Sequence, residues 1–289
     1  MRIRGLIAGL VATSIWGGMY VTTKVVLEVI PPFGLLWLRL LLGIMTLWLV
    51  LTRRGGVRFT PQQWRQVMGV GFIGYGISIA FQFVGTKLST ASNAALVTST
   101  TPAFAFLFAL WILKERVTPR RFAALCLSTL GVVAVIDPRS TRLSPELFWG
   151  NLSLIMAALT WALYSVFIRK VTRDLDTLSV SMAAFFGGLP LALPAAGWEY
   201  VATGWGDITV GVVLGVLYVG VVSTALAMYL WNLAFTYLEA GVASLTFFAQ
   251  PVVGAALGTI FLGEELTPLF LLGGVLIALG ILFVAQEKE

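Results

Sequence analysis

Two stretches of the chain decide its fold, namely NAALVTSTTPAFAFLFALWILKERVTP at 93–119 and VASLTFFAQPVVGAALGTIFLGEELTP at 242–268. Each is an apolar run long enough to cross a bilayer, because a spanning helix needs about 20 mostly apolar residues. Each run also carries an internal proline, Pro102 or Pro251, and ends in the pattern Glu-x-x-Thr-Pro. The shared spacing predicts two copies of one membrane-embedded unit.

The composition extends this interpretation to the whole chain. Of 289 residues, 58% are hydrophobic and 11% are charged, against roughly 25% charged in an ordinary soluble domain. A soluble protein of this length could not bury so much apolar surface. The net charge of +6 therefore indicates basic cytoplasmic loops in a lipid bilayer and not nucleic-acid binding.

Apolar runs follow one another along the chain with short charged or Pro/Gly breaks between them. In lipid, only helices and closed barrels satisfy every backbone group, and these runs are too long and continuous for barrel strands. We therefore expect an all-α integral membrane protein with ten transmembrane helices. The runs lie near 4–27, 33–51, 64–86, 91–113, 118–136, 146–169, 177–197, 208–235, 240–262 and 267–285.

Ten spans place both termini on the same side of the membrane, and basic residues indicate which side. With the termini inside, the cytoplasmic segments hold fourteen Lys and Arg residues, and the other side holds four. The positive-inside rule then predicts cytoplasmic termini in a multi-pass protein of the cell membrane. The fourteen are Arg2, Arg4, Arg53, Arg54, Arg58, Arg65, Lys114, Arg116, Arg120, Arg121, Arg169, Lys170, Arg173 and Lys288. The four are Lys24, Lys87, Arg139 and Arg142, and Arg39 lies within a span.

The internal similarity extends beyond the two quoted stretches. Each copy contains five helices. Because five is an odd number, the second copy must insert upside down relative to the first. We expect a first five-helix repeat at 1–140 and a second, inverted five-helix repeat at 141–289, an arrangement typical of secondary transporters. A shift of 149 residues aligns Pro102 with Pro251, Glu115 with Glu264 and Thr118 with Thr267, and a shift of 145 aligns Gly5 with Gly150, Trp16 with Trp161 and Lys24 with Arg169.

The chain resembles the drug/metabolite transporter superfamily, specifically its EamA-type ten-helix members. The residues that carry the resemblance are the two quoted stretches, WGGMYVTTK at 16–24, and the Pro31-Pro32 pair that leads to Arg39. The resemblance covers essentially the whole chain, and within the superfamily the chain is similar to the YddG-like amino-acid exporters. The resemblance implies export or facilitated movement of amino acids or related metabolites without ATP hydrolysis. It also implies a central cavity built from the first, third, fourth, sixth, eighth and ninth helices.

Polar and aromatic residues inside the spans are the candidate substrate-binding groups. Tyr75, Ser78 and Gln82 share one face of the third span, which indicates either a cavity wall or hydrogen bonds between helices. Trp16 and Trp161 correspond in the two halves, and they either belong to an interfacial aromatic belt or, since they lie nearer mid-depth, line the transport path. Aromatic rings beside hydroxyls suit an apolar side chain joined to a polar head group. The full candidate set is Trp16, Tyr20, Tyr75, Ser78, Gln82, Thr98, Trp161, Tyr164 and Ser244.

The prolines of the fourth and ninth spans are candidate gating hinges. A proline removes a backbone hydrogen bond, so Pro102 frees the carbonyl of Thr98 and Pro251 frees that of Phe247. Hydroxyl and amide side chains nearby, among them Thr101 and Gln250, lie beside these breaks. The breaks therefore indicate coordination of an ammonium group, a hinge, or a simple packing kink.

The remaining residues bear on alternative functions. Arg39 either extends to the outer interface or makes an anion contact or gate pair, with Glu28 as one partner. An intramembrane enzyme or a sensor is the alternative function, but the chain has no histidine, one cysteine and no carboxylate pair within a span. We therefore expect no enzyme activity, no cofactor and no metal. The expected partner is a small-molecule substrate, and the sequence leaves the oligomeric state open, a monomer included.

Overall fold

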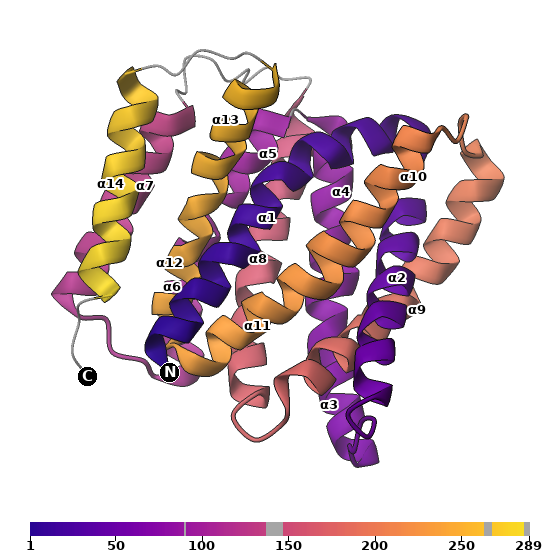
Figure 1. The fold of residues 1–289 in the computed structure, drawn as a ribbon, viewed down its shortest axis with the longest axis horizontal. Coiled ribbons are helices and arrows are strands. Elements are labelled where there is room, and N and C mark those ends of the chain that lie inside the picture. Colours follow the sequence, from indigo (N-terminus) through magenta and orange to yellow (C-terminus); the bar gives the residue numbers. More distant parts are fainter. Residues whose placement is uncertain (90, 137–146, 263–267, 286–289) are drawn as a thin grey trace.

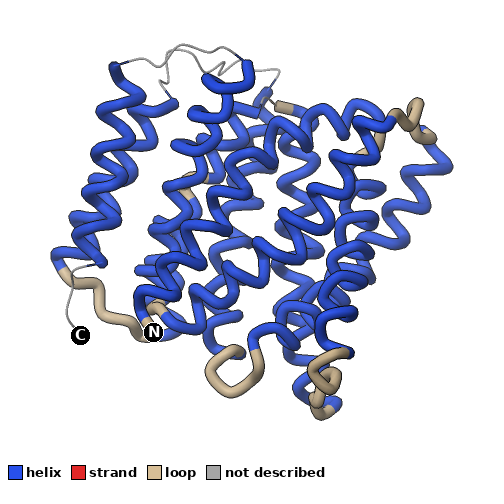
Figure 2. Tube along the Cα trace, viewed as in Figure 1, coloured by secondary structure: helices blue, strands red, loops and turns tan. Residues whose placement is uncertain are grey.

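The computed structural model describes residues 1–89, 91–136, 147–262 and 268–285, and every regular element within these ranges is a helix (Figure 2). The first half contains α1 (Arg2–Val29), α2 (Pro32–Thr52), α3 (Pro61–Gly71), η1 (Phe72–Ser78), α4 (Ile79–Leu88), α5 (Ala91–Thr98), α6 (Thr101–Phe108), η2 (Ala109–Leu113) and α7 (Pro119–Ile136). The second half contains α8 (Phe148–Val171), α9 (Thr177–Thr203), α10 (Val210–Leu217), η4 (Tyr218–Leu226), α11 (Ala227–Tyr237), α12 (Ala240–Leu245), η5 (Thr246–Phe248), α13 (Ala249–Leu262) and α14 (Pro268–Ala285). The expectation of an all-α chain is confirmed for these residues.

Several of these elements join into continuous segments of membrane-spanning length. Within the part of the chain that the structure describes, seven helical segments are long and apolar enough to cross a bilayer, as expected of a multi-pass membrane protein. They are Arg2–Val29, Pro32–Thr52, Pro61–Leu88, Leu96–Leu113, Phe148–Val171, Thr177–Thr203 and Val210–Tyr237, and the shorter apolar helices are Ala240–Gly254 and Leu271–Phe283.

The helix ends follow the sequence signals. Thr60 and Gln63 form a reciprocal capping box at the start of α3, with side-chain bonds of 3.3 and 2.8 Å to each other's backbone N–H. Thr118 accepts a bond of 3.2 Å from the N–H of Arg121 at the start of α7, as the Thr-Pro signal predicts. Its repeat counterpart Thr267 lies outside the described residues.

Some spans depart from regular α-helix in their middle. When the segments are numbered by the ten expected spans, η1 and η4 are π-helical turns inside the third (Pro61–Leu88) and the eighth (Val210–Tyr237), where hydrogen bonds skip one extra residue. The fourth segment changes from α5 to α6 just before Pro102, and the ninth contains the 3₁₀ turn η5 just before Pro251. Both prolines therefore sit at interruptions, where carbonyls are freed from the helical ladder.

The helices pack in matching pairs. α7 lies against α14 at one edge of the bundle, and α2 lies against α9 (Figure 1). In addition, α1 packs on α11 and α13, while α8 packs on α4 and α6. The start of α1, the end of α14 and the α2–α3 and α8–α9 connections lie at one end of the bundle, and the α9–α10 connection lies at the other (Figure 1).

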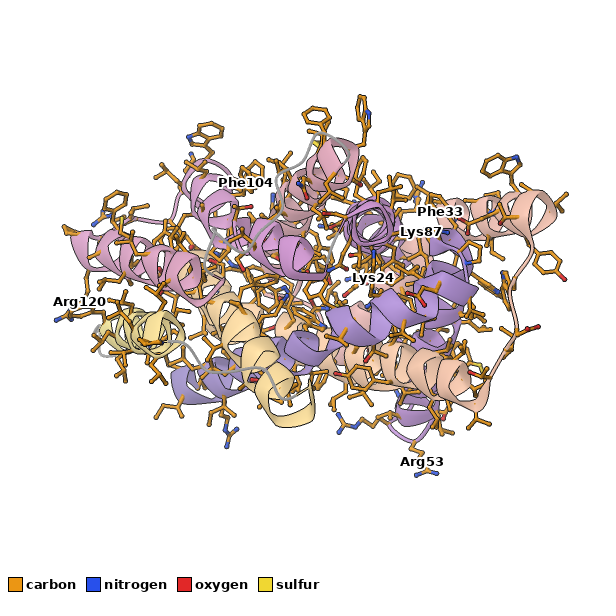
Figure 3. The ribbon with its side chains drawn as sticks, turned by 90° about the horizontal axis from the view of Figure 1, so that it is seen from above. Lys24, Phe33, Arg53, Lys87, Phe104 and Arg120 are labelled. Carbon is orange, nitrogen blue, oxygen red and sulfur yellow. The ribbon has the colours of Figure 1, made fainter. Side chains whose placement is uncertain are left out.

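Large apolar side chains cover the outside of the bundle. Trp111, Trp149 and Trp198 are each at least 70% exposed, which suits lipid contact and not water. Seen from above, Lys24 and Lys87 lie close together at one end of the bundle, whereas Arg53 and Arg120 project at its periphery (Figure 3).

Candidate functional site

A cavity lies inside the bundle where six helical segments meet. Its walls come from the first, third, fourth, sixth, eighth and ninth segments, the same six that the family resemblance implied. Its volume is about 30 Å³, which is room for only a few water molecules. The lining residues are Trp16, Met19, Ser78, Ile79, Gln82, Thr98, Thr101, Ala157, Ala158, Trp161, Met228, Phe247 and Gln250.

Tryptophan rings form one wall of the cavity. The ring of Trp16 lies edge-on to Trp161, with centroids 5.7 Å apart, and contacts Trp231 and Phe247 at 5.3 and 6.1 Å. The indole N–H of Trp16 donates to the carbonyl of Ser223 at 3.0 Å, which fixes the ring. Such clusters hold rigid, amphipathic surface in place. The sequence singled out Trp16 and Trp161 but not Trp231 or Phe247, because nothing distinguishes one more aromatic residue in an apolar chain.

A polar network lies behind Trp161 and joins four segments. The Tyr164 hydroxyl donates to Asn232 Oδ1 at 2.8 Å and accepts from the Tyr75 hydroxyl at 2.6 Å. Asn232 Nδ2 in turn donates to Ser181 Oγ at 2.9 Å. Tyr75 and Tyr164 are both fully buried and do not line the cavity. The structure therefore gives them interhelical hydrogen bonds. Both rings contact Trp161, which lines the cavity, with centroids 5.9 and 4.7 Å from it.

A second polar group lies on the cavity wall itself. Gln82 Nε2 donates to the Tyr20 hydroxyl at 3.0 Å, which lies 2.7 Å from Thr98 Oγ1. Ser78 Oγ donates to the carbonyl of Ala157 at 2.8 Å. Ser78, Gln82 and Thr98 line the cavity, and Tyr20 lies directly behind two of them.

Three side chains of this cavity present buried polar atoms without a hydrogen-bond partner. These atoms are Gln82 Oε1, Thr101 Oγ1 and Gln250 Nε2. A buried polar atom left unsatisfied costs about 1–3 kcal/mol, so a ligand or water that bonds to it is stabilised by the same amount. Ser244, by contrast, donates to the carbonyl of Gly241 at 2.8 Å and does not line the cavity. In the ninth segment the residues that line the cavity are Phe247 and Gln250, whereas the sequence analysis had proposed Ser244.

Arg39 is the one charged side chain found deep within a span among the described residues. It is 1% exposed, so it does not extend to the membrane surface as one of its interpretations required. Its Nε donates to Thr224 Oγ1 at 2.8 Å, and its guanidinium carbon lies 5.1 Å from the centre of the Phe83 ring. Nη1 and Nη2 have no partner, and no ion pair joins Arg39 to Glu28 in the described part of the chain.

Basic residues hold backbone carbonyls at opposite ends of the bundle. Arg169, at the end of α8, donates to the carbonyl of Phe235 at 2.9 Å and also to that of Leu238. Lys24, its counterpart in the sequence repeat, donates to the carbonyls of Thr86 and Ser89 at 2.9 and 2.7 Å. Each cation therefore closes the chain turn that follows the helix packed beside it.

The carboxylate of Glu115 adds to the contacts at the end of the bundle where Arg169 lies. Glu115 accepts a bond of 3.0 Å from Arg169 Nε and bonds of 2.9 and 3.2 Å from the N–H groups of Ala240 and Gly241. It thus pairs with a cation and caps the start of α12 at the same time. Arg121 forms a second ion pair nearby, with Glu239.

Apolar helices of membrane-spanning length, packed around a small cavity with tryptophan walls and unsatisfied amide groups, define the class of protein: a multi-pass membrane protein with an internal cavity. The EamA-like transporter family model matches the chain twice, over residues 3–136 and 148–286. The chain belongs to that family, and it is a small-molecule transporter of the drug/metabolite type.

Relatives and a solved structure agree with this assignment. The chain is 26% identical over 282 residues to an "Uncharacterized transporter" of Archaeoglobus fulgidus, covering 95% of both chains. It is 28% identical over 293 residues to a "Probable amino-acid metabolite efflux pump" of Salmonella typhimurium, covering 97% of this chain and 94% of that one. A solved structure, titled "Crystal structure of protein", superposes with a TM-score of 0.80 at 21% identity over 98% of this chain and 96% of the other, which supports the fold.

Proposed function

We propose that this protein is a secondary transporter that exports neutral or aromatic amino acids, or closely related metabolites, across the cell membrane by alternating access without ATP hydrolysis. The observation that carries the proposal is the cavity itself, where tryptophan rings lie beside three unsatisfied polar atoms. Rings suit an apolar side chain, and amide and hydroxyl groups suit its polar head group. The likeness to a relative named as an amino-acid metabolite efflux pump favours the same substrate class.

The proposed architecture is ten transmembrane helices in two inverted five-helix halves, 1–140 and 141–289. The pairing of helices supports it, since exchanging the halves turns α1 on α11 into α8 on α4, and leaves α7 on α14 and α2 on α9 unchanged. A two-fold axis in the membrane plane produces such a pattern, and secondary transporters place the substrate at the interface between repeats. The six-segment cavity lies at that interface.

Alternating access requires two ends that can close separately. Arg169 and Lys24 hold equivalent turns. Arg169 lies near the end of α8 and Lys24 near the end of α1, and these two helix ends lie at opposite ends of the bundle (Figure 1). Because the cavity has room for only a few waters, a substrate enters only when one end moves apart. We therefore expect opening of the bundle at either end to break the hydrogen bonds of Arg169 or Lys24 to these backbone carbonyls.

Flux in proteoliposomes tests the proposal. Proteoliposomes that contain the purified protein and are loaded with radiolabelled amino acids should release the neutral or aromatic ones faster than protein-free liposomes do. A sugar phosphate and a nucleotide serve as control solutes. Flux of the control solutes alone, or of no solute at all, would overturn the proposal.

The orientation has a separate test. In a Cys126→Ala background, Gln62→Cys marks the start of α3 and Ile208→Cys marks the α9–α10 connection. With cytoplasmic termini, an impermeant thiol reagent applied to whole cells should label residue 208 and not residue 62. Labelling of both from the same side would contradict the topology.

A further inference from the structure

The hydrogen bonds around Tyr20 have one possible direction. Thr98 Oγ1 lies 2.6 Å from the carbonyl oxygen of Ala94, and a carbonyl cannot donate, so the hydroxyl proton of Thr98 must lie between them. Thr98 Oγ1 is also 2.7 Å from the Tyr20 hydroxyl. Since the single proton of Thr98 is already used, Tyr20 is the donor in that bond.

The same logic fixes the amide of Gln82. Its terminal group lies 3.0 Å from the Tyr20 hydroxyl, whose own proton points to Thr98. Tyr20 can therefore only accept from Gln82, which requires the NH₂ side of the amide to face it. The carbonyl oxygen of the amide is left on the other side, where Gln82 lines the cavity and Oε1 has no partner.

The opposite character is found on the ninth segment. Gln250 is 1% exposed, lines the same cavity and has an unpartnered Nε2 donor. Thr101, on the fourth segment, adds an unpartnered hydroxyl. The cavity therefore offers a fixed acceptor from the third segment and donors from the fourth and ninth, and Trp16 and Trp161 line the same cavity. No carboxylate is among its lining residues.

We propose that Gln82 Oε1 binds the ammonium group of the transported amino acid, and that Tyr20 and Thr98 are positioning residues that hold this oxygen toward the substrate. The inference rests on the proposed transport of amino acids and specifies which head group the site selects. A fixed carbonyl oxygen in a low-dielectric site accepts a charge-assisted hydrogen bond from one N–H of the ammonium group. A substrate without the ammonium leaves Oε1 unsatisfied and is rejected. The carboxylate of the substrate meets the donors of Gln250 and Thr101.

The test uses two substitutions at one position. Thr98→Val is close in shape but accepts no bond, so the Tyr20 proton turns to Gln82, the amide flips, and its NH₂ faces the cavity. Thr98→Ser retains the hydroxyl and the original direction. The probes are L-phenylalanine and 3-phenylpropanoate, which has hydrogen in place of the ammonium, compared as competitors of labelled phenylalanine flux in proteoliposomes.

Wild type and Thr98→Ser should prefer L-phenylalanine by about ten- to a hundredfold, the range expected when one hydrogen bond to a charged group is lost. Thr98→Val should lose at least about tenfold of this preference through a higher KM for phenylalanine, with little change in maximal rate. A purely structural effect would instead lower the maximal rate and leave the preference intact.

A second substitution keeps the test decisive if Thr98→Val does not fold. Tyr20→Phe removes the acceptor for Gln82 Nε2, so the amide takes both orientations and the preference falls by a smaller factor. If Thr98→Val folds and keeps the wild-type preference for phenylalanine, the inference is overturned while transport stays established. If only Tyr20→Phe folds, the wild-type preference in that variant overturns the inference in the same way. Absence of amino-acid flux in the wild type would overturn the proposed function and this inference together.

Discussion

Gly71→Ala should destabilise the protein by forcing two helices apart. Gly71 ends α3, and a Cβ built there would lie 2.0 Å from the carbonyl oxygen of Ala184 on α9, whereas ordinary carbon–oxygen contacts are about 3.3–3.6 Å. α3 and α9 would therefore have to separate by more than about 1 Å. The clash is with backbone, so no side chain can rotate away. Gly187 continues the same seam, since its Cβ would lie 2.1 Å from the carbonyl oxygen of Met68.

Overpacking of this kind costs about 1–3 kcal/mol, and a backbone clash belongs at the upper end. At roughly 2–4 °C per kcal/mol for a large domain, the melting temperature of detergent-purified Gly71→Ala should fall by about 6–12 °C. The matched control is Gly69→Ala on the same helix, where a Cβ meets nothing within 4 Å. That change should be neutral or stabilise by up to about 1 kcal/mol through helix propensity. Melting of the two variants within about 2 °C of each other would refute the close approach of α3 and α9.

Three further outcomes are expected. Trp161→Ala should reduce amino-acid flux by about fivefold or more, since stacking and burial of one aromatic ring contribute at least about 1 kcal/mol. The exposed Trp111→Ala should keep its flux, and equal flux in the two variants would show that the aromatic cluster serves packing alone. Arg39→Met should melt no lower than wild type, because replacing a buried charge that has no counter-ion among the described residues is neutral or stabilising. A fall of several degrees would show that its bond to Thr224 and its contact with Phe83 outweigh the cost of burying the charge. A pH gradient imposed on proteoliposomes at clamped membrane potential should not drive accumulation of substrate above equilibrium, and such accumulation would establish proton coupling.

Most of the helical framework could be predicted from the sequence, because apolar length and proline position act locally. Pro32 and Pro119 begin helices as their positions indicated. The π turns η1 and η4 could not be predicted, because an extra residue in the hydrogen-bond ring leaves no mark in composition. They matter for the site, since the 3.6-residue period used to place Tyr75 beside Gln82 does not hold across η1.

Part of the candidate site could be predicted from the sequence. Periodicity and repeat correspondence identified Trp16 and Trp161, and the structure places both on the cavity wall together with Ser78, Gln82 and Thr98. Tyr75 and Tyr164 are aromatic and buried like Trp16 and Trp161, yet they bond to each other and to Asn232 and do not line the cavity. A sequence pattern cannot separate a hydroxyl that faces a cavity from one that faces another helix. The apolar lining residues, such as Met228 and Phe247, carry no signal at all in a chain that is 58% hydrophobic.

The carboxylates of this protein bear on how transport is driven. Glu199 accepts the N–H groups of Phe33 and Gly34 at 2.8 and 3.0 Å, and so caps α2 from the far end of α9. Asp176 caps α9 through Ser179 N–H at 2.9 Å, and Glu115 caps α12. Each of these acids is thus engaged at a helix end, where backbone N–H groups and the helix dipole favour a carboxylate, and none is on the cavity wall. A proton-driven carrier needs an ionisable group that substrate and proton reach in turn. The lining of the cavity offers amides, hydroxyls and indole rings, and we therefore expect transport down the substrate's own gradient.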